Sequence, residues 1–169
     1  GSANNQFNSP RDIAIDSSGN IYVSDEGNDR IMKWAPGANS GTVVAGGNGE
    51  GSNLNQLKRP IDIVGDSSGA LFIADHNNNR IVKWNSGASE GTLIAGPKEP
   101  AMEYKGIDLD GLGNLFIADQ SNDRVIKWTP GKTSGTVVAG GNGAGSNSNQ
   151  LDDPDTVSID ALGNLYVAD

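Results

Sequence analysis

Residues 10–34 read PRDIAIDSSGNIYVSDEGNDRIMKW, and this stretch decides the fold because close copies of it recur along the chain. Branched and aromatic residues gather in the runs 12–16, 21–25 and 30–34, which predicts three short strands. A further apolar run at 42–45 predicts a fourth strand. Gly, Asn, Asp, Ser and Pro fill the positions between the runs, and none of them has helical periodicity. The unit is therefore predicted to be a small four-stranded sheet.

Three further copies follow the first, and each carries an aspartate at the end of its first predicted strand. These aspartates are Asp16, Asp66, Asp110 and Asp160, so successive copies are 50, 44 and 50 residues apart. A period of this length, made of several short apolar runs, indicates propeller blades rather than a solenoid. The first strands carry apolar or small residues on both faces, which favours sheets packed between two neighbours, as radial stacking requires. The predicted blades cover approximately residues 10–46, 60–96 and 104–140, with a half-blade at 154–169.

The shared phrase P-x-x-I-x-x-D-x-x-G-N-[IL]-[YF]-[VI]-x-D-x-x-N-x-R-[IV]-x-K-W resembles the NHL repeat over nearly the whole chain. The resemblance implies an all-β fold, a β-propeller of four-stranded blades that belongs to a six-bladed ring, with about three and a half blades in this chain. Two departures stand out, because Tyr104 replaces the leading proline of the third copy and Gly65 weakens the first strand of the second. Members of the family include protein-binding scaffolds, RNA binders, extracellular sensors and a metal-dependent lyase. The motif therefore specifies the fold far more than the function.

The two ends of the sequence lead to a second expectation. Residues 1–7 align with the linker residues 51–57 and 145–151, and the chain stops after the second strand of the fourth copy. Six blades of this length would need roughly 290 residues. We expect the sequence to be a window from a longer repeat array. The alternative is that several copies of the chain complete a ring or a filament.

Residues that recur in every copy are interpreted as structural. Asp25, Asn28 and Arg30 lie in the connection between the second and third strands, where short polar side chains bond loop backbone and arginine pairs with aspartate. The tryptophans of the third strands are predicted to pack between blades; they are Trp34, Trp84 and Trp128. The lysines that precede them are interpreted as solvated side chains that protect a sheet edge; they are Lys33, Lys83 and Lys127.

Function is sought where the copies differ. In a propeller the linkers between blades and the connections between second and third strands emerge on one face, around the mouth of the central channel. The linker at 97–105 is six residues shorter than the other two, and His76 replaces Glu26 and Gln120. Asp108 stands where other copies have apolar or small residues, and a buried carboxylate must be paired or neutralised, so it is either a hydrogen-bonded part of the structure or part of a channel site. The binding residues predicted on this face are Tyr104, Lys98, Met102, Lys105, His76, Arg59 and Asp108.

Composition argues against most site chemistries. One His and no Cys exclude a thiolate metal site, a cysteine nucleophile and a zinc site of His and Cys ligands, and no G-x-S-x-G motif presents a serine. Calcium remains an alternative through the carboxylates of Asp12, Asp62 and Asp108, but no D-x-D-x-D-G loop occurs and no cofactor is expected. With 12 basic against 21 acidic residues, the net charge of −9 repels nucleic acid. No apolar run is long enough to cross a membrane.

The sequence thus predicts a non-catalytic protein-interaction or scaffold module that presents its linker face to a protein partner or to further blades. Two alternatives stay open, a self-assembling structural repeat protein that forms homo-oligomers and a propeller enzyme or sensor with a calcium site at the channel mouth. The compartment is not determined, although the composition slightly favours an extracellular protein.

Overall fold

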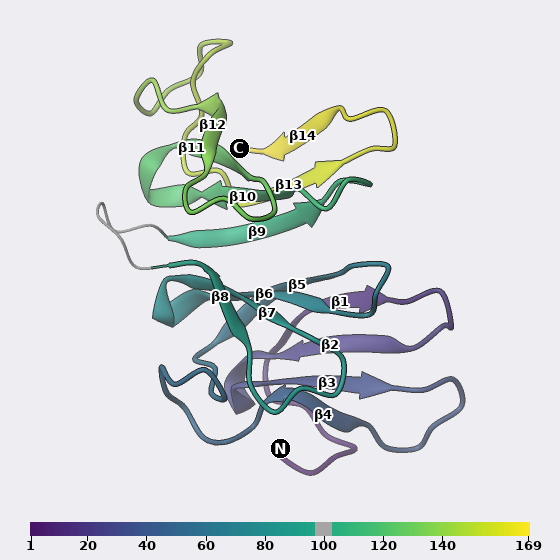
Figure 1. Ribbon diagram of the computed structural model, residues 1–169. Helices are drawn as coiled ribbons and strands as arrows, with labels where there is room; N and C mark the ends of the chain where they lie inside the picture. Colours follow the sequence, from purple (N-terminus) through teal and green to yellow (C-terminus); the bar gives the residue numbers. More distant parts are fainter. Residues whose placement is uncertain (97–102) are drawn as a thin grey trace. The chain divides into compact units, whose positions relative to one another are not determined.

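The computed structural model of the protein describes residues 1–96 and 103–169, and it is all-β. Within these residues the strands form three four-stranded antiparallel sheets and one two-stranded sheet, each with its strands in chain order (Figure 1). The chain divides into two compact units, Gly1–Ile94 and Ala95–Asp169. The predicted division into repeated small sheets is confirmed.

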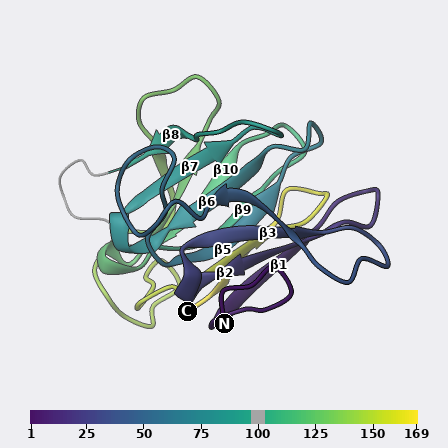
Figure 2. The same cartoon turned by 90° about the horizontal axis from the view of Figure 1, so that it is seen from below.

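The first unit holds the first two repeats. The strands of repeat one are β1 (Pro10–Ile15), β2 (Ile21–Asp25), β3 (Arg30–Trp34) and β4 (Thr42–Gly46), and those of repeat two are β5 (Pro60–Gly65), β6 (Leu71–Asp75), β7 (Arg80–Trp84) and β8 (Thr92–Ala95). A short 3₁₀ turn joins the second and third strands of each repeat, η1 (Glu26–Asn28) and η2 (His76–Asn78). Figures 1 and 2 both show β1, β2 and β3 side by side. Strand β5 of repeat two packs against β1 of repeat one.

The second unit holds repeat three and the two strands of repeat four. Repeat three consists of β9 (Tyr104–Leu109), β10 (Leu115–Asp119), β11 (Arg124–Trp128) and β12 (Thr136–Gly140), with η3 (Gln120–Asn122) between β10 and β11. Repeat four consists of β13 (Thr156–Ile159) and β14 (Leu165–Ala168), which pair with each other. None of the helices in the described part of the chain is long and apolar enough to cross a membrane.

The second and third strands of repeat one have the bounds that the sequence predicts. The first strand begins earlier than predicted, at Pro10 instead of Asp12, and its pairing with β2 shifts between Pro10 and Ile13. A proline is tolerated at the first position of a strand, because its missing N–H is not needed for the ladder there. The bulge lets the strand continue through Asp12 to Ile15.

The core of the first unit lies between its two sheets. Tyr22, Ile31 and Ala45 of repeat one belong to one buried cluster with the apolar side chains of repeat two. The repeat-two members of this cluster are Leu57, Ile63, Leu71, Ile73, Val82 and Trp84. Trp84 therefore packs between blades, as predicted, and each sheet buries its face against the next repeat.

The second unit repeats this arrangement on a smaller scale. Phe116, Ala118 and Val125 of repeat three form a buried cluster with Val157 of repeat four. Partly buried residues pack against it, among them Ile159. Two neighbouring repeats again share one apolar core.

The three lysines of the third strands were wrongly predicted to protect a sheet edge. Strands β3, β7 and β11 are internal in their sheets, because β4, β8 and β12 pair outside them. Each lysine lies over the aromatic ring of the neighbouring second strand, at 4.9 Å from its Nζ to the ring centroid for Lys83 and Phe72. The lysines thus cover aromatic side chains by cation–π contact.

Candidate functional site

Each four-stranded sheet has two loop ends, and hydrogen bonds and close contacts identify which loops share an end. The incoming linker meets the connection between second and third strands, as in the bonds from Gly27 N to Asn8 O (2.9 Å) and from Asn77 N to Lys58 O (3.2 Å). We call this the corner end. The turn between first and second strands lies beside the loop between third and fourth strands, because a Cβ on Gly19 would meet Pro36 at 3.4 Å. We call this the turn end.

At the corner end, a buried aspartate and arginine fasten the linker to the sheet. In repeat two the carboxylate of Asp75 accepts hydrogen bonds from the Lys58 amide (2.6 Å), the Asn78 side chain (2.8 Å) and Arg80 Nε (2.6 Å). The guanidinium of Arg80 also donates to three linker carbonyls, those of Ser52, Asn53 and Gln56. Burial raises the pKa of Asp75, while the bonds from Asn78, the Lys58 amide and Arg80 oppose that shift. The structural role predicted for these recurring residues is confirmed.

Two of the predicted binding residues are engaged in ion pairs at the corner end. Arg59 Nε donates to Glu26 Oε1 at 2.7 Å, and the Arg59 amide donates to Asp29 Oδ1 at 2.9 Å, so this residue ties the linker of repeat two to η1 of repeat one. Lys105 Nζ lies 3.1 Å from Asp155 Oδ1 and joins β9 to the start of repeat four. Both side chains therefore brace neighbouring repeats.

The prediction that Tyr104 is an exposed contact is wrong, because its side chain is 1% exposed. Tyr104 begins β9 opposite Asp119, at the position that the buried Pro60 and Pro154 hold in repeats two and four. Burial, with the charge of Asp119, raises the pKa of the Tyr104 phenol to about 12. Tyr104, which has no aromatic counterpart in the other copies, is therefore a core residue of the second unit.

Asp108, which the sequence left open between a structural and a channel role, joins two first strands. Its Oδ2 accepts hydrogen bonds from the Ile159 amide (2.8 Å) and the Ser158 hydroxyl (3.2 Å) of β13. In the first unit Asp12 Oδ2 accepts from the Ile63 amide of β5 in the same way (3.0 Å). These half-buried carboxylates are therefore satisfied by the backbone of the next repeat, which supports the structural alternative for Asp108.

The remaining predicted contacts are less informative. Lys98 and Met102 lie outside the described residues, and His76 is half-buried at the first position of η2. Asp62, the third calcium candidate, accepts a hydrogen bond from the Ile63 amide through Oδ1 (2.8 Å). Within residues 1–96 and 103–169, no three His, Cys, Asp or Glu side chains come together as a metal site would require.

The turn end is built differently, from one short turn that every repeat shares. In repeat one Asp16 Oδ1 accepts the amides of Ser18 and Asn20 (both 2.9 Å), while Gly19 has a positive φ of 77°. The hydrogen bond from the Asn20 side chain, ahead of the other bonds to the carboxylate, lowers the pKa of Asp16. The recurring aspartate thus holds the turn, and the tip residues between Asp16 and Gly19 take no part in it through their side chains.

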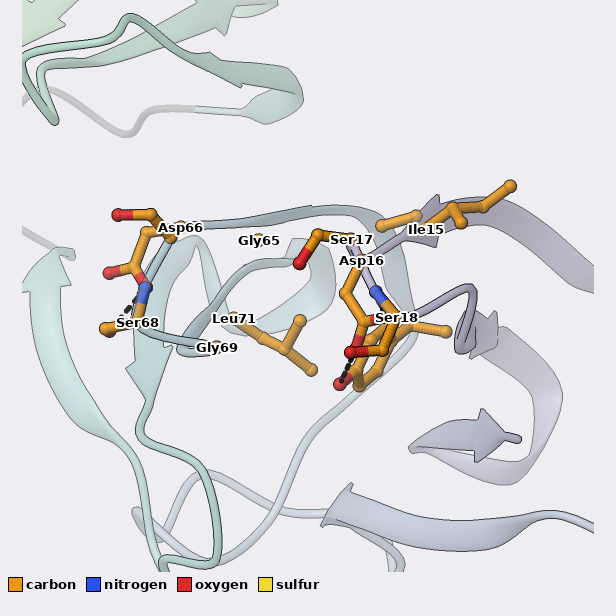
Figure 3. Close-up of a pocket in the computed structure, with 12 residues that line it drawn as sticks. Ile15, Asp16, Ser17, Ser18, Gly65, Asp66, Ser68, Gly69 and Leu71 are labelled. Carbon is orange, nitrogen blue, oxygen red and sulfur yellow. Dashed lines mark hydrogen bonds between the residues drawn. The ribbon is translucent and has the colours of Figure 1, made fainter. Parts of the chain in front are cut away.

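A shallow cleft of about 480 Å³ opens between the turn ends of repeats one and two. Figure 3 shows Asp16, Ser17 and Ser18 on one side, Asp66, Ser68 and Gly69 on the other, and Leu71 between them. All lining residues belong to the first unit, so the cleft lies within one compact body. Its lining combines hydroxyl groups with an apolar floor, as small-molecule sites commonly do.

Comparison with known proteins identifies the repeat and its architecture. Residues 7–34 match the NHL repeat. The chain contains an NHL repeat, and its sheets are blades of the β-propeller kind. No curated protein was found to match the chain in sequence.

Several solved propeller structures resemble the chain over nearly all of its length. The crystal structure of a nidogen/laminin complex matches 97% of the chain with a TM-score of 0.75 at 23% identity, and 57% of that chain is covered. A streptogramin B lyase structure matches 98% with a TM-score of 0.63 at 14% identity, and virginiamycin B lyase from Staphylococcus aureus matches 98% with a TM-score of 0.64 at 11% identity. The chain covers 48% and 50% of these two lyases, so it spans about half the length of the structures it matches. At these identities the likeness shows the fold alone.

The turn-end cleft was not predicted from the sequence. The tips of the turns read Ser17-Ser18 and Ser67-Ser68 in repeats one and two, but Gly111-Leu112 and Ala161-Leu162 in repeats three and four. This difference, together with Gly65, is a signal that the sequence contains. It was missed because variable residues were sought at the corner end alone.

Proposed function

We propose that this chain is a non-catalytic protein-interaction and scaffold module that associates through the faces of its blades. One observation carries the proposal: residues at matched positions in repeats one and two differ in how much of their surface is exposed. Ile63 and Leu71 of repeat two are each 4% exposed, because repeat one packs against them. Their counterparts Ile13 and Ile21 are 60% and 40% exposed. Repeat one therefore presents the same kind of face without the blade that covers it in repeat two.

The open face is shaped to receive apolar side chains. Phe7, Ile21, Trp34 and Pro36 line a groove of about 330 Å³ on repeat one. Trp34 Nε1 has no hydrogen-bond partner in the described chain, whereas Trp84 Nε1 donates to the Ala88 carbonyl at 2.9 Å. The Trp34 N–H is itself buried, so the groove offers apolar contact area, and an exposed apolar groove is typical of a surface that another protein covers.

The complementary face is open in the second unit. Tyr22, Phe72 and Phe116 hold matched positions in repeats one to three and are each 7% exposed. Tyr166 holds the same position in repeat four and is 58% exposed. A chain that presents both halves of one repeating contact is suited to head-to-tail association, in which the two surfaces of the contact differ. We propose that a further blade, from the same protein or from a second copy of this chain, covers each of the two open faces.

The similar structures support an interaction role in a limited way. The match with a TM-score of 0.75 is a complex between two proteins, nidogen and laminin, whereas other matches are lyases. Among the residues predicted at the corner end, Arg59 and Lys105 brace neighbouring repeats and Tyr104 lies in the core. We therefore place recognition on blade faces rather than in a catalytic pocket.

Two variants test the proposal, and each of them disrupts one of the two open faces while it keeps the other. The head variant is Ile13→Lys with Ile21→Lys, the tail variant is Tyr166→Lys, and Leu54→Lys in an exposed linker is the control. We expect wild type and control to associate with rising concentration in sedimentation velocity, and each face variant alone to remain a monomer. Mixed in equal amounts, the two face variants should form a dimer, because each retains the surface that the other lacks.

Other outcomes contradict this proposal. A wild-type chain that stays monomeric throughout the concentration series has no blade-face contact between copies. Association that is lost in the head variant but unchanged in the tail variant indicates a symmetric contact of two head faces. Equal association of all variants places the contact elsewhere.

A further inference from the structure

The cleft between the turn ends of repeats one and two exists because Gly65 leaves space over Leu71. Gly65 pairs with Leu71 at the end of β5, and a Cβ built on it points toward Leu71, 3.7 Å from Cδ2. The other repeats carry larger side chains at the matched position, namely Ile15, Leu109 and Ile159. A branched side chain at position 65 would therefore extend over the floor of the cleft.

Neither backbone conformation nor close packing requires glycine at position 65. Its φ lies outside the left-handed region, and no heavy atom lies closer than 3.7 Å to the position of a Cβ. Gly106 in β9 is different, because a Cβ there would lie 2.5 Å from Thr156 Cα. Glycine within a strand lowers stability relative to alanine. The structural effect of Gly65 is the hollow, since the position has no side chain to fill it.

The matched place in the second unit is filled. Ile159 packs against the buried cluster of Phe116, Ala118, Val125 and Val157. The turn tips also differ, because Leu112 and Leu162 replace the serines and are 84% and 88% exposed. In the described chain, a hollow lined by hydroxyl groups thus belongs to the contact of repeats one and two.

The two carboxylates in the cleft are already saturated with hydrogen bonds. Asp16 accepts two bonds on each oxygen, from the Ser18 and Asn20 amides, the Asn20 side chain and the Tyr22 hydroxyl. Asp66 also accepts four, from the Ser68 and Ala70 amides, the Ser68 hydroxyl and Lys83 Nζ. A carboxylate offers about four acceptor positions, so a metal ion would have to displace these donors. Two negative charges also repel a phosphate or another anion.

The groups left for a ligand are neutral. The hydroxyls of Ser17, Ser18 and Ser67 line the cleft and have no hydrogen-bond partner among the described residues. Each can donate one hydrogen bond and accept others. Half-buried Ala14 supplies apolar contact area between the two turns, and Leu71, which is 4% exposed, closes the floor. The volume of about 480 Å³ falls within the range of small-molecule sites.

We infer that this cleft binds a neutral polyhydroxylated ligand, a monosaccharide or the terminal sugar of a glycan. The hydroxyls of Ser17, Ser18 and Ser67 exchange hydrogen bonds with the ligand hydroxyls, and the apolar face of the sugar ring packs against Ala14. The site is independent of the blade-face association proposed above, since it occupies the turn end. A negative result for sugar binding would therefore leave the proposed blade-face association untouched, and a negative result for association would leave sugar binding untouched.

Titration of the full chain with methyl glycosides tests the inference. Glucose, galactose, mannose and N-acetylglucosamine derivatives are added separately while amide shifts are followed by nuclear magnetic resonance. At least one sugar should shift the amides of Ser17, Gly65 and Ser67 in a saturable way. Gly65→Ile, which restores the side chain found in repeats one and four, should abolish the shifts while raising the melting temperature. Ser17→Ala with Ser67→Ala should weaken binding by about tenfold, on the scale of one or two lost hydrogen bonds.

The controls decide between ligand sources and competing explanations. Ser40→Ala changes an exposed serine in the loop between β3 and β4, outside the cleft lining, and should leave the titration unchanged. A terminal glycan is the source if a glycopeptide with the same sugar binds at least as tightly as the methyl glycoside, and a free monosaccharide if it binds more weakly. The inference is overturned if no sugar gives saturable shifts, if Gly65→Ile leaves them intact, or if only calcium or phosphate moves these amides.

Discussion

The two loop ends of the blades use the same kinds of polar residue for different purposes. At the corner end, aspartate and arginine are buried and form hydrogen bonds with each other and with the linker backbone, as Asp75 and Arg80 do. At the turn end, the aspartate holds its own turn and leaves the neighbouring serines exposed. A corner therefore cannot vary without loosening the contact between linker and sheet, whereas a turn tip can change from serine to leucine at little cost. Recognition is accordingly expected where the scaffold does not need the side chains.

The largest effect should come from breaking a corner. Arg80→Ala removes the partner of a buried carboxylate and the donor to three carbonyls, so we expect the free energy of unfolding to fall by about 3–5 kcal/mol. Arg124→Ala in repeat three should cost less, because the Arg124 side chain is 20% exposed against 7% for Arg80. Urea unfolding followed by circular dichroism measures both. If both variants lose less than about 1 kcal/mol of unfolding free energy, the effect is that of an ordinary surface substitution, and the buried pairs at the corner end do not hold the linker to the sheet.

The second effect concerns Tyr104, a corner-end residue buried in the core. A phenol whose pKa is raised by folding contributes stability that is complete below its ordinary pKa of 10 and is lost as pH rises through about 12. The loss should approach about 2–3 kcal/mol at the upper end of this window. Difference titration of phenol absorbance between wild type and Tyr104→Phe should reveal one tyrosine with a pKa of about 12. A value near the ordinary 10 would mean that the site is open to water.

A smaller effect is expected from opening a turn. Asp66→Ala removes the acceptor of four hydrogen bonds, but the freed amides can reach water, so we expect a loss of about 1–2 kcal/mol. Ser67→Ala, its neighbour without hydrogen bonds through its hydroxyl in the described chain, serves as the control and should change stability by less than about 0.5 kcal/mol. Urea unfolding of the two variants measures the difference, and equal losses would mean that the carboxylate does not hold the turn.

The dependence of the unfolding free energy on pH also distinguishes the turn-end aspartate from the corner-end aspartate. Burial acts to raise the pKa of Asp66, but hydrogen bonds from Ser68, Lys83 and the Ala70 amide outweigh it and lower that pKa. A lowered pKa contributes stability that is present above the ordinary value and lost as pH falls through the folded value. Asp75 at the corner has a raised pKa and so the opposite dependence. Asp66→Ala should therefore flatten the fall of unfolding free energy in acid, and an unchanged acid limb would contradict this assignment.

The sequence predicted the strands and corners well because their determinants are local and repeated. The runs 21–25 and 30–34 became β2 and β3 with the same bounds, and the pairing of Asp25 with Arg30 followed from residue types that recur at one spacing. The start of β1 was missed because a proline was treated as a boundary although it is tolerated at the first position of a strand.

The site was harder to predict because it depends on two turns 50 residues apart. Ser17, Ser67 and Gly65 are ordinary residues for a turn or a strand end, and only their juxtaposition makes a cleft. Tyr104 was predicted as a binding residue of the linker face because the copies differ there, but a difference between copies does not place a side chain on the surface. The buried Pro60 and Pro154 at the matched position show that this place faces the core.

The smallest effect, and the one that most directly tests the purpose of the turn end, is a gain in stability. Gly65→Ala should raise the free energy of unfolding by about 0.5–1 kcal/mol, because alanine costs less backbone entropy in a strand and its Cβ meets Leu71 at an ordinary 3.7 Å. Gly106→Ala makes the same change at a different strand position, in β9, and should instead destabilise, since its Cβ would lie 2.5 Å from Thr156 Cα. Thermal unfolding of both variants separates the two kinds of glycine. If Gly65→Ala destabilises as Gly106→Ala does, the backbone needs glycine at position 65 and the cleft is a by-product of packing. If it stabilises, the chain carries an avoidable weakness at the place where exposed hydroxyl groups surround a hollow, which is the signature expected of a site kept for a ligand.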